Sequence, residues 1–420
     1  MVLAAGNRRR GYRCGVTVVP TAPLVVVTNW GIKGVPLLGG VLLALAVGAV
    51  AYWRTLRRTR PVSLKAVCAA AAIALAAAWL VPVLFSSDVY AYAAYGEMAR
   101  IGFNPYALAP ADAADPLLRA AQLQWVTAFP ICLYGPAFVA LADFLVTTLA
   151  PWGPPAQLDA FRVTASAAFL LCVPLAYCAF SGDRAQRLRA AATIGLNPAA
   201  IWCAAEGHND AIALAVVLAG FVLVRRRLFN AGAAVVALSS IIKPPGMAAA
   251  IALAIVERRA RIGALAGIAI AVALSSPLIA GVATQLAPHG TYAPQASLQA
   301  IFRPLGAFVS CAAAFVAAAL LARRGVALLR ARLAEGWIWL GLAAWVLVPN
   351  PYPWYALWLV ALAGLAPRSR AGAVAILLSL TALLRYVPDA IAIPSPPIAA
   401  ALGIAAALPL LGLCYNERPA

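Results

Sequence analysis

The chain has 420 residues, of which 64% are hydrophobic and only 11% are charged. Soluble globular domains carry roughly a quarter charged residues, so a soluble protein is excluded. Repeated apolar runs of about 18 or more residues are typical of membrane-spanning helices. The runs are continuous and rich in Ala and Leu, which excludes a barrel of alternating strands. The composition therefore predicts an all-α, polytopic transmembrane helical bundle.

The formal net charge of +19 comes from 32 Lys and Arg against 13 Asp and Glu. Most of the basic residues form short clusters between apolar runs, which is the pattern of cytoplasmic loops in membrane proteins. The excess charge therefore indicates topology, and no nucleic-acid partner is expected. The clusters lie at residues 54–65, 184–189, 225–227, 258–261, 323–332 and 368–370.

The chain divides into a short N-terminal part and one large domain. Residues 1–34 are basic and then weakly apolar, with breaks at Pro20 and Pro23, and they form either an extension or a short span. A signal peptide is a further alternative, although no clear cleavage site follows. Residues 35–415 are expected to form a single transmembrane domain of about 10–13 helices.

Two stretches of this domain have irregular spans. Asp88 is expected outside and the basic cluster at 184–189 inside, so an odd number of spans must separate them. Two apolar runs, 127–150 and 160–180, lie between them. One run therefore does not fully span, or it breaks at Pro130, Pro136 or "PWGPP". The run at 231–256 contains "IIKPPG", so we expect a hairpin of two half-helices around Lys243 and Pro244.

In this topology the polar segments opposite the basic clusters lie on the external side of the membrane. Any surface chemistry is expected on that side, and the first external loop, residues 86–126, is the longest of these segments. The other segments are 206–210, 282–303, 349–355 and 388–395.

The first external loop begins "SSDVYAYAAYGEMARIGFNPY". On a helix Asp88, Tyr92 and Tyr95 share one face, and Glu97 points elsewhere. The segment is amphipathic enough to lie along the membrane interface. Asp88 either belongs to a helix cap or is a carboxylate base whose pKa is raised by apolar surroundings.

The segment "EGHND" places His208, Asn209 and Asp210 between two apolar runs. The polar side chains either cap a helix or face a cavity, because charged groups are costly in lipid. Zinc sites need three or four ligands at matching spacing. The chain has only two histidines, and its eight cysteines stand singly, so we expect no zinc site and no metal; a divalent metal on Asp88 plus Asp210 is the weaker alternative.

Some cations or potential cations that lie away from the basic clusters are candidates for binding an anion. Lys243 stands inside an apolar run and is a candidate for binding an anion. The loop 282–303 carries His289 and Arg303. Arg303 either extends its charged end to the interface or neutralises a phosphate.

The segment "PNPYPWYALW" gathers Tyr352, Trp354 and Tyr355 at one membrane edge. The aromatic residues either form an interfacial belt or a stacking platform for a sugar ring or lipid head group.

These motifs together resemble a known family. Asp88 is followed by "GFNPY", "LYGPAF", "LNPAAIWCAAEGHNDAIAL", "IIKPPG" and "NPYPWYALWLV". This ordered set is similar to that of polyprenol-phosphate-mannose-dependent mannosyltransferases, which belong to the C-type glycosyltransferase superfamily. The resemblance covers residues from about 66 to 366. The basic N-terminal stretch and the short chain depart from larger members, which leaves the linkage and the acceptor open.

The resemblance implies a C-type glycosyltransferase-like fold with a catalytic first external loop that carries short interfacial helices. It implies transfer of a hexose, most simply mannose, from a polyprenyl-phosphate donor to a lipid or glycan acceptor. Transfer would proceed with inversion at the outer face of the cytoplasmic membrane, with Asp88 as base. The expected phosphate ligands are Arg303, Lys243, His208 and His289. The expected sugar or acceptor contacts are Tyr92, Tyr95, Glu97, Asn209, Asp210, Tyr352, Trp354 and Tyr355.

The resemblance requires no cofactor, and a lipid-phosphate leaving group does not need a magnesium clamp. The partners are the lipid-linked donor, the acceptor and membrane lipids. Two alternatives stay open. The first is a glycan-lipid transporter or flippase, since acidic residues in spans often relay protons. The second is a transferase that uses polyprenyl-phosphate arabinose or glucose.

Overall fold

The structure is a computed structural model that describes residues 35–58, 62–81, 83, 85–110, 115–124, 129–285, 293–387 and 396–413. Every regular element in these ranges is a helix, so the all-α class predicted from composition is confirmed for them. The basic N-terminal stretch 1–34 lies outside the described residues.

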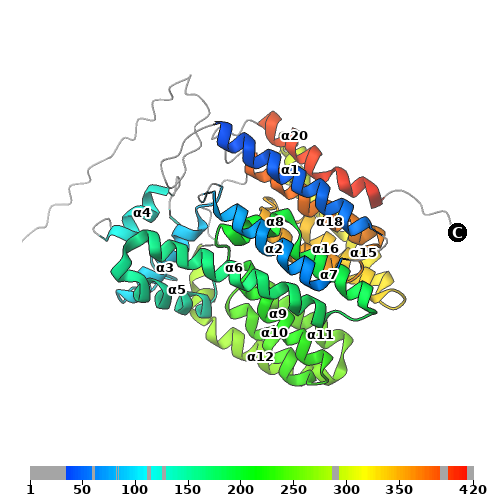
Figure 1. The fold of residues 1–420 in the computed structure, drawn as a ribbon, viewed down its shortest axis with the longest axis horizontal. Helices are drawn as coiled ribbons and strands as arrows, with labels where there is room; N and C mark the ends of the chain where they lie inside the picture. The colour runs from blue at the N-terminus through cyan, green and yellow to red at the C-terminus, as the bar shows by residue number, and fades with distance from the viewer. Residues whose placement is uncertain are drawn as a thin grey trace, which may run out of the picture.

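Helix α6 (Gly153–Ala179) lies at the centre of the N-terminal part, where it packs against α2, α3, α5, α7, α8 and α9 (Figure 1). It begins after a short 3-10 turn at the "PWGPP" segment, where Gly153 has a φ of +78°. The helices before and after it are α1 (Val35–Arg57), α2 (Leu64–Trp79), α3 (Asp88–Arg100), α4 (Pro116–Gln124), α5 (Pro136–Leu149), α7 (Arg184–Gly195), α8 (Pro198–Ala205) and α9 (Asp210–Arg225).

Two further groups of helices complete the fold (Figure 1). The first packs on α9 and is made of α10 (Phe229–Leu238), α11 (Pro245–Val256) and α12 (Arg261–Leu274), followed by α13 (Ser276–Gln285). The second is made of α14 (Leu298–Phe302), α15 (Ala307–Leu328), α16 (Leu333–Val346), α17 (Ala356–Ala363), α18 (Arg370–Thr381) and α20 (Pro396–Ala407). Short 3-10 turns η2 (Ser239–Ile241), η4 (Arg303–Leu305), η5 (Pro353–Tyr355) and η6 (Ala382–Arg385) connect some of these helices.

The lengths of the helices bear on the membrane topology. Three are long and apolar enough to cross a membrane, namely Gly39–Arg57, Pro136–Ala179 and Ala307–Leu328. A fourth span results if α8 and α9, which are bent by 116°, count as one. Other apolar helices in the described ranges have 10–17 residues. The expected 10–13 spans therefore stay a prediction, because polar and Pro-containing breaks divide many of the apolar runs.

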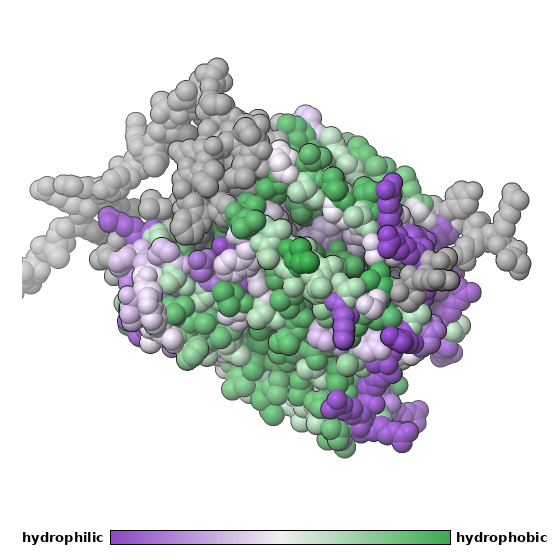
Figure 2. Space-filling model, in the orientation of Figure 1, coloured by the Kyte–Doolittle hydropathy of each residue, from purple (hydrophilic) through white to green (hydrophobic). Residues whose placement is uncertain are grey.

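The surface has the distribution of a membrane protein. Figure 2 shows an apolar belt across the visible face, with hydrophilic residues towards its right-hand and left-hand edges. Large apolar side chains are exposed on several helices, for example Ile73 at 71%, Phe144 at 63% and Phe315 at 68%. A soluble monomer rarely exposes so much contiguous apolar surface, whereas lipid tails cover it favourably.

Helix α3 differs from the amphipathic interfacial helix expected from its sequence. All residues from Val89 to Met98 are buried, because α4, α5 and α6 pack around it. The close approach of α5 depends on Gly96, since a Cβ there would lie 2.6 Å from the carbonyl oxygen of Ala142. The first residue of α3, Asp88, is thereby directed into the protein interior.

The break predicted at Lys243 and Pro244 is confirmed. Helix α10 ends in η2, and α11 begins at Pro245. The turn before α5 packs directly on this break, because the amide of Gly135 donates to the carbonyl of Ile242 at 3.2 Å. A Cβ at Gly135 would lie 2.1 Å from the carbonyl oxygen of Ile241, so only glycine allows this contact. The contact brings Tyr134 next to Lys243.

Candidate active site

Asp88 is the first residue of α3, and its amide is bound by the Ser86 hydroxyl at 3.2 Å. Its carboxylate does not cap the helix but faces two groups from other segments. The Tyr134 hydroxyl donates to Oδ2 at 3.4 Å, and Nδ1 of His208 lies 3.6 Å from the same oxygen. The Asp88 side chain is 17% exposed, so it is accessible but largely surrounded by protein.

Burial raises the pKa of Asp88 to about 6. The positive charge of Lys243 opposes this rise, the negative charge of Asp210 adds to it, and hydrogen bonds from Tyr134 and Tyr92 oppose it. A carboxyl group with a pKa near the working pH is both available as carboxylate and basic enough to take a proton. The environment of Asp88 therefore suits a general base.

The "EGHND" segment forms the sharp break between α8 and α9. The chain turns at Gly207, whose φ is +91°, a conformation that favours glycine. His208 is 2% exposed and Asn209 is fully buried. Among the described residues, both ring nitrogens of His208 and Nδ2 of Asn209 have no hydrogen-bond partner. Buried polar atoms usually have partners, so these three atoms are exceptions that lie together beside Asp88.

Lys243 supplies the positive charge at this break. Its ammonium donates to Oδ2 of Asp210 at 2.5 Å and to Oδ1 of Asn209 at 3.2 Å. The other oxygen of Asp210 accepts from the indole of Trp358 at 2.7 Å. A buried ion pair is tolerated when extra hydrogen bonds satisfy it. We call Asp88, Tyr134, His208, Asn209, Asp210 and Lys243 the Asp88 cluster.

A row of stacked planar groups leads away from the Asp88 cluster. The His208 ring lies on Trp354 with centroids 4.1 Å apart, and Trp354 lies on Tyr352 at 4.4 Å. The guanidinium of Arg385 then lies 4.6 Å from the Tyr352 ring, and its Nη2 donates to the Tyr352 hydroxyl at 3.2 Å. The row thus extends from beside Asp88 to a second buried cation, since Arg385 is 6% exposed.

The remaining aromatic candidates have separate positions. Tyr92 is fully buried and donates to Oδ1 of Asn209 at 3.4 Å. Tyr95 donates to the carbonyl of Pro130 at 3.0 Å and supports the turn before α5. The Tyr355 ring lies 5.5 Å from the Lys243 ammonium.

Three candidates lie apart from the Asp88 cluster. Glu97 is on another face of α3, as the helical spacing predicts, where it pairs with Arg100. Arg303 is half-buried in η4, which packs against α14, α15 and α20. Within the described ranges it makes no hydrogen bond or ion pair with the cluster. His289 lies outside the described residues. The roles expected for these three stay predictions.

Tyr134 and Arg385 are site residues that the sequence did not single out. Tyr134 belongs to "LYGPAF", and the Gly-Pro turn after it was a usable signal for a tightly packed bend. Arg385 stands alone in "ALLRYVP". An isolated charge inside an apolar run is a functional candidate, and the same argument that selected Lys243 applies to it.

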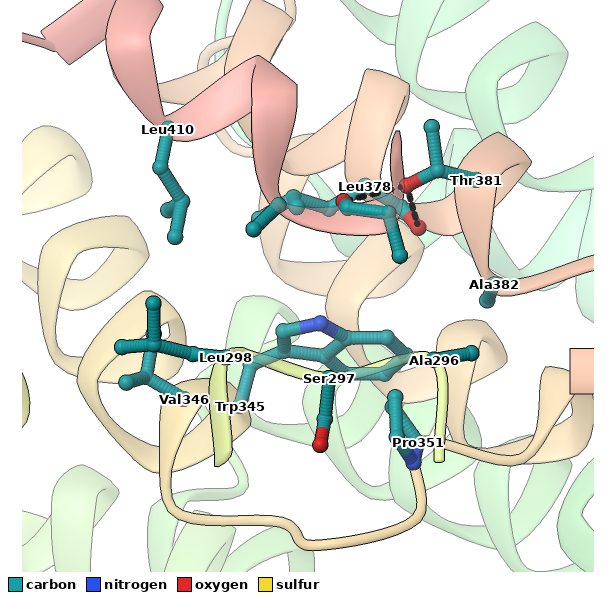
Figure 3. Close-up of a pocket in the computed structure, with 12 residues that line it drawn as sticks. Ala296, Ser297, Leu298, Trp345, Val346, Pro351, Leu378, Thr381, Ala382 and Leu410 are labelled. Carbon is teal, nitrogen blue, oxygen red and sulfur yellow. Dashed lines mark hydrogen bonds between the residues drawn. The ribbon is translucent and has the colours of Figure 1, made fainter. Parts of the chain in front are cut away.

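A small apolar pocket lies between α14, α16, α18 and α20 (Figure 3). It is separate from Asp88, but it adjoins the stacked row, because Pro351 and Ala382 line it and precede Tyr352 and Arg385. Its two hydroxyl groups are already bonded to the backbone: Ser297 donates to the carbonyl of Pro349 at 2.8 Å, and Thr381 to that of Ala406 at 2.9 Å. The pocket therefore offers only apolar surface.

Potential metal ligands do not gather in the described part of the chain. No group of three or more His, Cys, Asp or Glu side chains there could hold a metal ion. The expectation that no metal or cofactor is needed stays a prediction.

Comparison with known proteins gives the family. Residues 3–259 match the family model described as Alpha-(1->6)-mannopyranosyltransferase, N-terminal domain. The chain is 29% identical over 184 residues to Alpha-(1->6)-mannopyranosyltransferase A of Corynebacterium glutamicum, which covers 40% of this chain and 34% of that protein. It is 40% identical over 73 residues to the Mycobacterium tuberculosis protein of the same name, which covers 16% of this chain and 14% of that protein.

The aligned part of the chain thus spans about a third or less of either curated relative. No solved structure matches the chain. The family match extends over more than half of the chain and includes Asp88, Tyr134, the "EGHND" segment and Lys243. This chain therefore belongs to the alpha-(1->6)-mannopyranosyltransferase family.

Proposed function

We propose that this protein is an integral membrane mannosyltransferase. It transfers mannose from a polyprenyl-phosphate donor to a lipid or glycan acceptor, with inversion. The observation that carries the proposal is the Asp88 cluster: a carboxyl group with a pKa of about 6 stands beside buried polar atoms without partners and beside a buried ammonium. The family match supports mannose over glucose or arabinose as the transferred sugar.

In the proposed reaction Asp88 removes the proton from the acceptor hydroxyl. The oxygen then forms a bond to C1 of the sugar while the bond from C1 to the phosphate oxygen breaks. The proton ends on Oδ2 of Asp88, and the electron pair of the broken bond leaves with the lipid phosphate. A single displacement inverts the configuration at C1, so an α-linked product requires a β-linked donor.

The leaving phosphate needs positive charge where its own charge develops. Lys243 is held by Asp210 at the centre of the cluster, and Arg385 stands at the far end of the stacked row. We propose that Lys243 faces the phosphate where its charge develops and that Arg385 attracts the anionic donor at the far end of the row. Arg303 and His289 are further candidates from the sequence; Arg303 makes no hydrogen bond or ion pair with the cluster within the described ranges, and His289 lies outside them.

The two ends of the donor suit different surroundings. Tyr352 and Tyr355 are partly exposed beside the cluster, and aromatic rings offer flat surfaces to the apolar faces of a sugar. The pocket in Figure 3 adjoins Tyr352 and Arg385 and carries no free hydroxyl group. We propose that the isoprenoid chain passes over this apolar side of the stacked row.

The proposed location is the cytoplasmic membrane, with the site on the outer side. The exposed arginines at residues 225–227 and at 258 and 259 support a cytoplasmic position of those loops, because basic loops stay inside. The acceptor then approaches from the aqueous side, and membrane lipids cover the apolar belt. No nucleic-acid partner and no cofactor are part of the proposal.

The test is transfer by the purified protein in lipid nanodiscs. Matched reactions contain β-linked polyprenyl-phosphate mannose, the corresponding glucose and arabinose donors, or GDP-mannose, each with a mannan or glycolipid acceptor. We expect radiolabel to pass to the acceptor from the mannose lipid and not from GDP-mannose. Transfer from GDP-mannose alone would contradict the donor. Movement of the lipid across a proteoliposome membrane without transfer would favour a flippase.

A further inference from the structure

Two buried charged side chains lie outside the Asp88 cluster, between the segments that carry its reactive groups. Arg162 on α6 is 5% exposed, and Glu206 at the end of α8 is 3% exposed. Burying a charge is costly unless it is paired or hydrogen-bonded. Both side chains have partners in the segment that leads into Asp88, residues 81–88, and in the segment that leads into His208, residues 204–208.

Arg162 joins the starts of the two segments. Its Nε donates to the carbonyl of Ala205 at 2.8 Å, and its Nη2 donates to the carbonyl of Val81 at 3.2 Å. The guanidinium also lies 4.1 Å from the Trp79 ring and pairs with Asp159 at 3.2 Å. These contacts fix a planar fork in one orientation, which the ammonium of a lysine does not reproduce.

Glu206 also contacts both segments. Its Oε1 accepts from the amide of Phe85 at 2.9 Å, three residues before Asp88. Its Oε2 lies 4.0 Å from Nε2 of His208, whose other nitrogen faces Asp88 at 3.6 Å. One carboxylate therefore touches the chain that leads into Asp88 and faces the imidazole next to Asp88.

The turn at Gly207 places the second segment directly on α6. A Cβ at this position would lie 3.4 Å from the backbone nitrogen of Arg162 and 3.3 Å from Val89. The positive φ of Gly207 and this approach place the break against α6 and α3. The contacts of Arg162 and Glu206 therefore act on segments that are already held at short range.

We propose that Arg162 and Glu206 are positioning residues that hold the Asp88 carboxylate and the His208 imidazole at their catalytic spacing. The proposal rests on the proposed function, since it takes Asp88 as the base. Neither side chain touches the reacting atoms in this proposal. A displacement of about 1 Å in a reacting geometry can cost roughly 10²-fold in rate, so loss of either side chain should lower kcat more than it raises KM.

The test compares Arg162→Lys, Glu206→Gln and Glu206→Ala with Arg187→Lys. Arg187 on α7 is a matched control that contacts the C-terminal end of α6. Its guanidinium donates to the carbonyl of Tyr177 at 2.8 Å and lies 4.0 Å from the Tyr177 ring. We expect Arg162→Lys and Glu206→Ala to lower kcat by about 10- to 100-fold with donor KM changed less than about threefold. Glu206→Gln keeps an acceptor for the Phe85 amide and should lose less than Glu206→Ala.

A second measurement does not depend on transfer. The pH dependence of unfolding is recorded for each variant with and without Asp88→Asn, which isolates the contribution of Asp88. The charged and titratable groups facing Asp88 are Tyr92, Tyr134, His208, Asp210 and Lys243. These groups are unchanged in every variant. If Arg162 and Glu206 keep water away from Asp88, their loss lowers the pKa of Asp88. The part of the stability that depends on Asp88 is then lost at lower pH, and Arg187→Lys has no such effect.

The two measurements separate the two proposals. A wild-type protein that transfers no mannose would contradict the proposed function, while the unfolding data would still test the positioning role. If Arg162→Lys and Glu206→Ala lower the unfolding temperature but leave kcat and the Asp88 contribution as in wild type, the two residues only stabilise the fold and the inference is wrong.

Discussion

The Asp88 cluster and the turn η4 both carry a cation that the sequence predicted for the same site, but the surroundings of the two cations differ. Lys243 is 7% exposed and is bound by Asp210 and Asn209. Arg303 is half-buried at the edge of the C-terminal helices, and within the described ranges it has no ion-pair partner. A charge at a break inside the core must find partners, and those partners bring several segments together. A charge at an edge has no such requirement.

The largest loss of stability is expected where the cluster loses its ammonium. Lys243→Met leaves Asp210 buried without its ion-pair partner, and breaking a buried pair costs about 3–5 kcal/mol. Transfer should fall by about 100-fold or more, because the leaving phosphate also loses a cation. Unfolding and transfer are measured on the same preparation.

A second variant separates charge balance from function in this pair. Lys243→Met combined with Asp210→Asn removes both charges and should recover much of the stability without recovering transfer. Recovery of transfer in the double variant would show that Lys243 only balances Asp210.

Asp88 itself should make the folded protein less stable above pH 6. Its pKa is about 6 in the fold and 3.8 in the unfolded chain, so the folded state holds the proton more tightly between these values. The associated stability is complete below pH 4 and is lost as the pH rises through 6. At pH 7 Asp88→Asn should therefore stabilise the protein by about 2–3 kcal/mol.

Unfolding of wild type and Asp88→Asn at pH 4 and pH 7 gives the comparison. The two proteins should differ little at pH 4. An equal difference at both pH values would place Asp88 in water, with an ordinary pKa.

Arg385 and Arg303 provide a direct comparison of a core cation with an edge cation. Arg385→Gln should raise the KM for the lipid donor about tenfold, equivalent to ~1.4 kcal/mol, with little effect on the acceptor. Arg303→Ala should leave both constants near wild type. Kinetic titration of donor and acceptor in turn measures this. The reverse pattern would indicate that the phosphate binds near Arg303 in η4, which the sequence also predicted as a phosphate ligand.

The smallest effect is expected from metal removal. The proposal assigns the compensating charge to Lys243 and Arg385, so transfer in excess EDTA should stay within about twofold of the untreated rate. Activity that is lost in EDTA and restored by Mg²⁺ or Mn²⁺ would require a metal beside Asp88 and Asp210.

Much of the site could be predicted from sequence where a motif marked a break in an apolar run. Asp88, the "GHND" residues and Lys243 were selected because polar residues there are costly unless they have a purpose, and the structure brings them together. The Pro-Pro-Gly sequence after Lys243 also predicted the break between η2 and α11 correctly.

Other features needed tertiary contacts that the sequence does not display. The Tyr and Ala residues of α3 fit a half-exposed helix equally well, and only the packing of α4, α5 and α6 buries them all. Arg162 and Arg385 lie in apolar helical stretches without a distinctive spacing, so their neighbours could not be deduced. The number of spans was equally undetermined, because hydropathy does not tell a crossing helix from a broken one.

The measurement closest to the central claim is the rate of mannose transfer by Asp88→Asn across pH 5 to 8, compared with wild type. In wild type, kcat/KM should rise with pH and level off above about 6, as the Asp88 carboxyl ionises. The variant should transfer roughly 10²–10⁴-fold more slowly and lose this pH dependence while remaining folded. A variant that keeps near wild-type turnover with the same rise near pH 6 would contradict the assignment of Asp88 as the base.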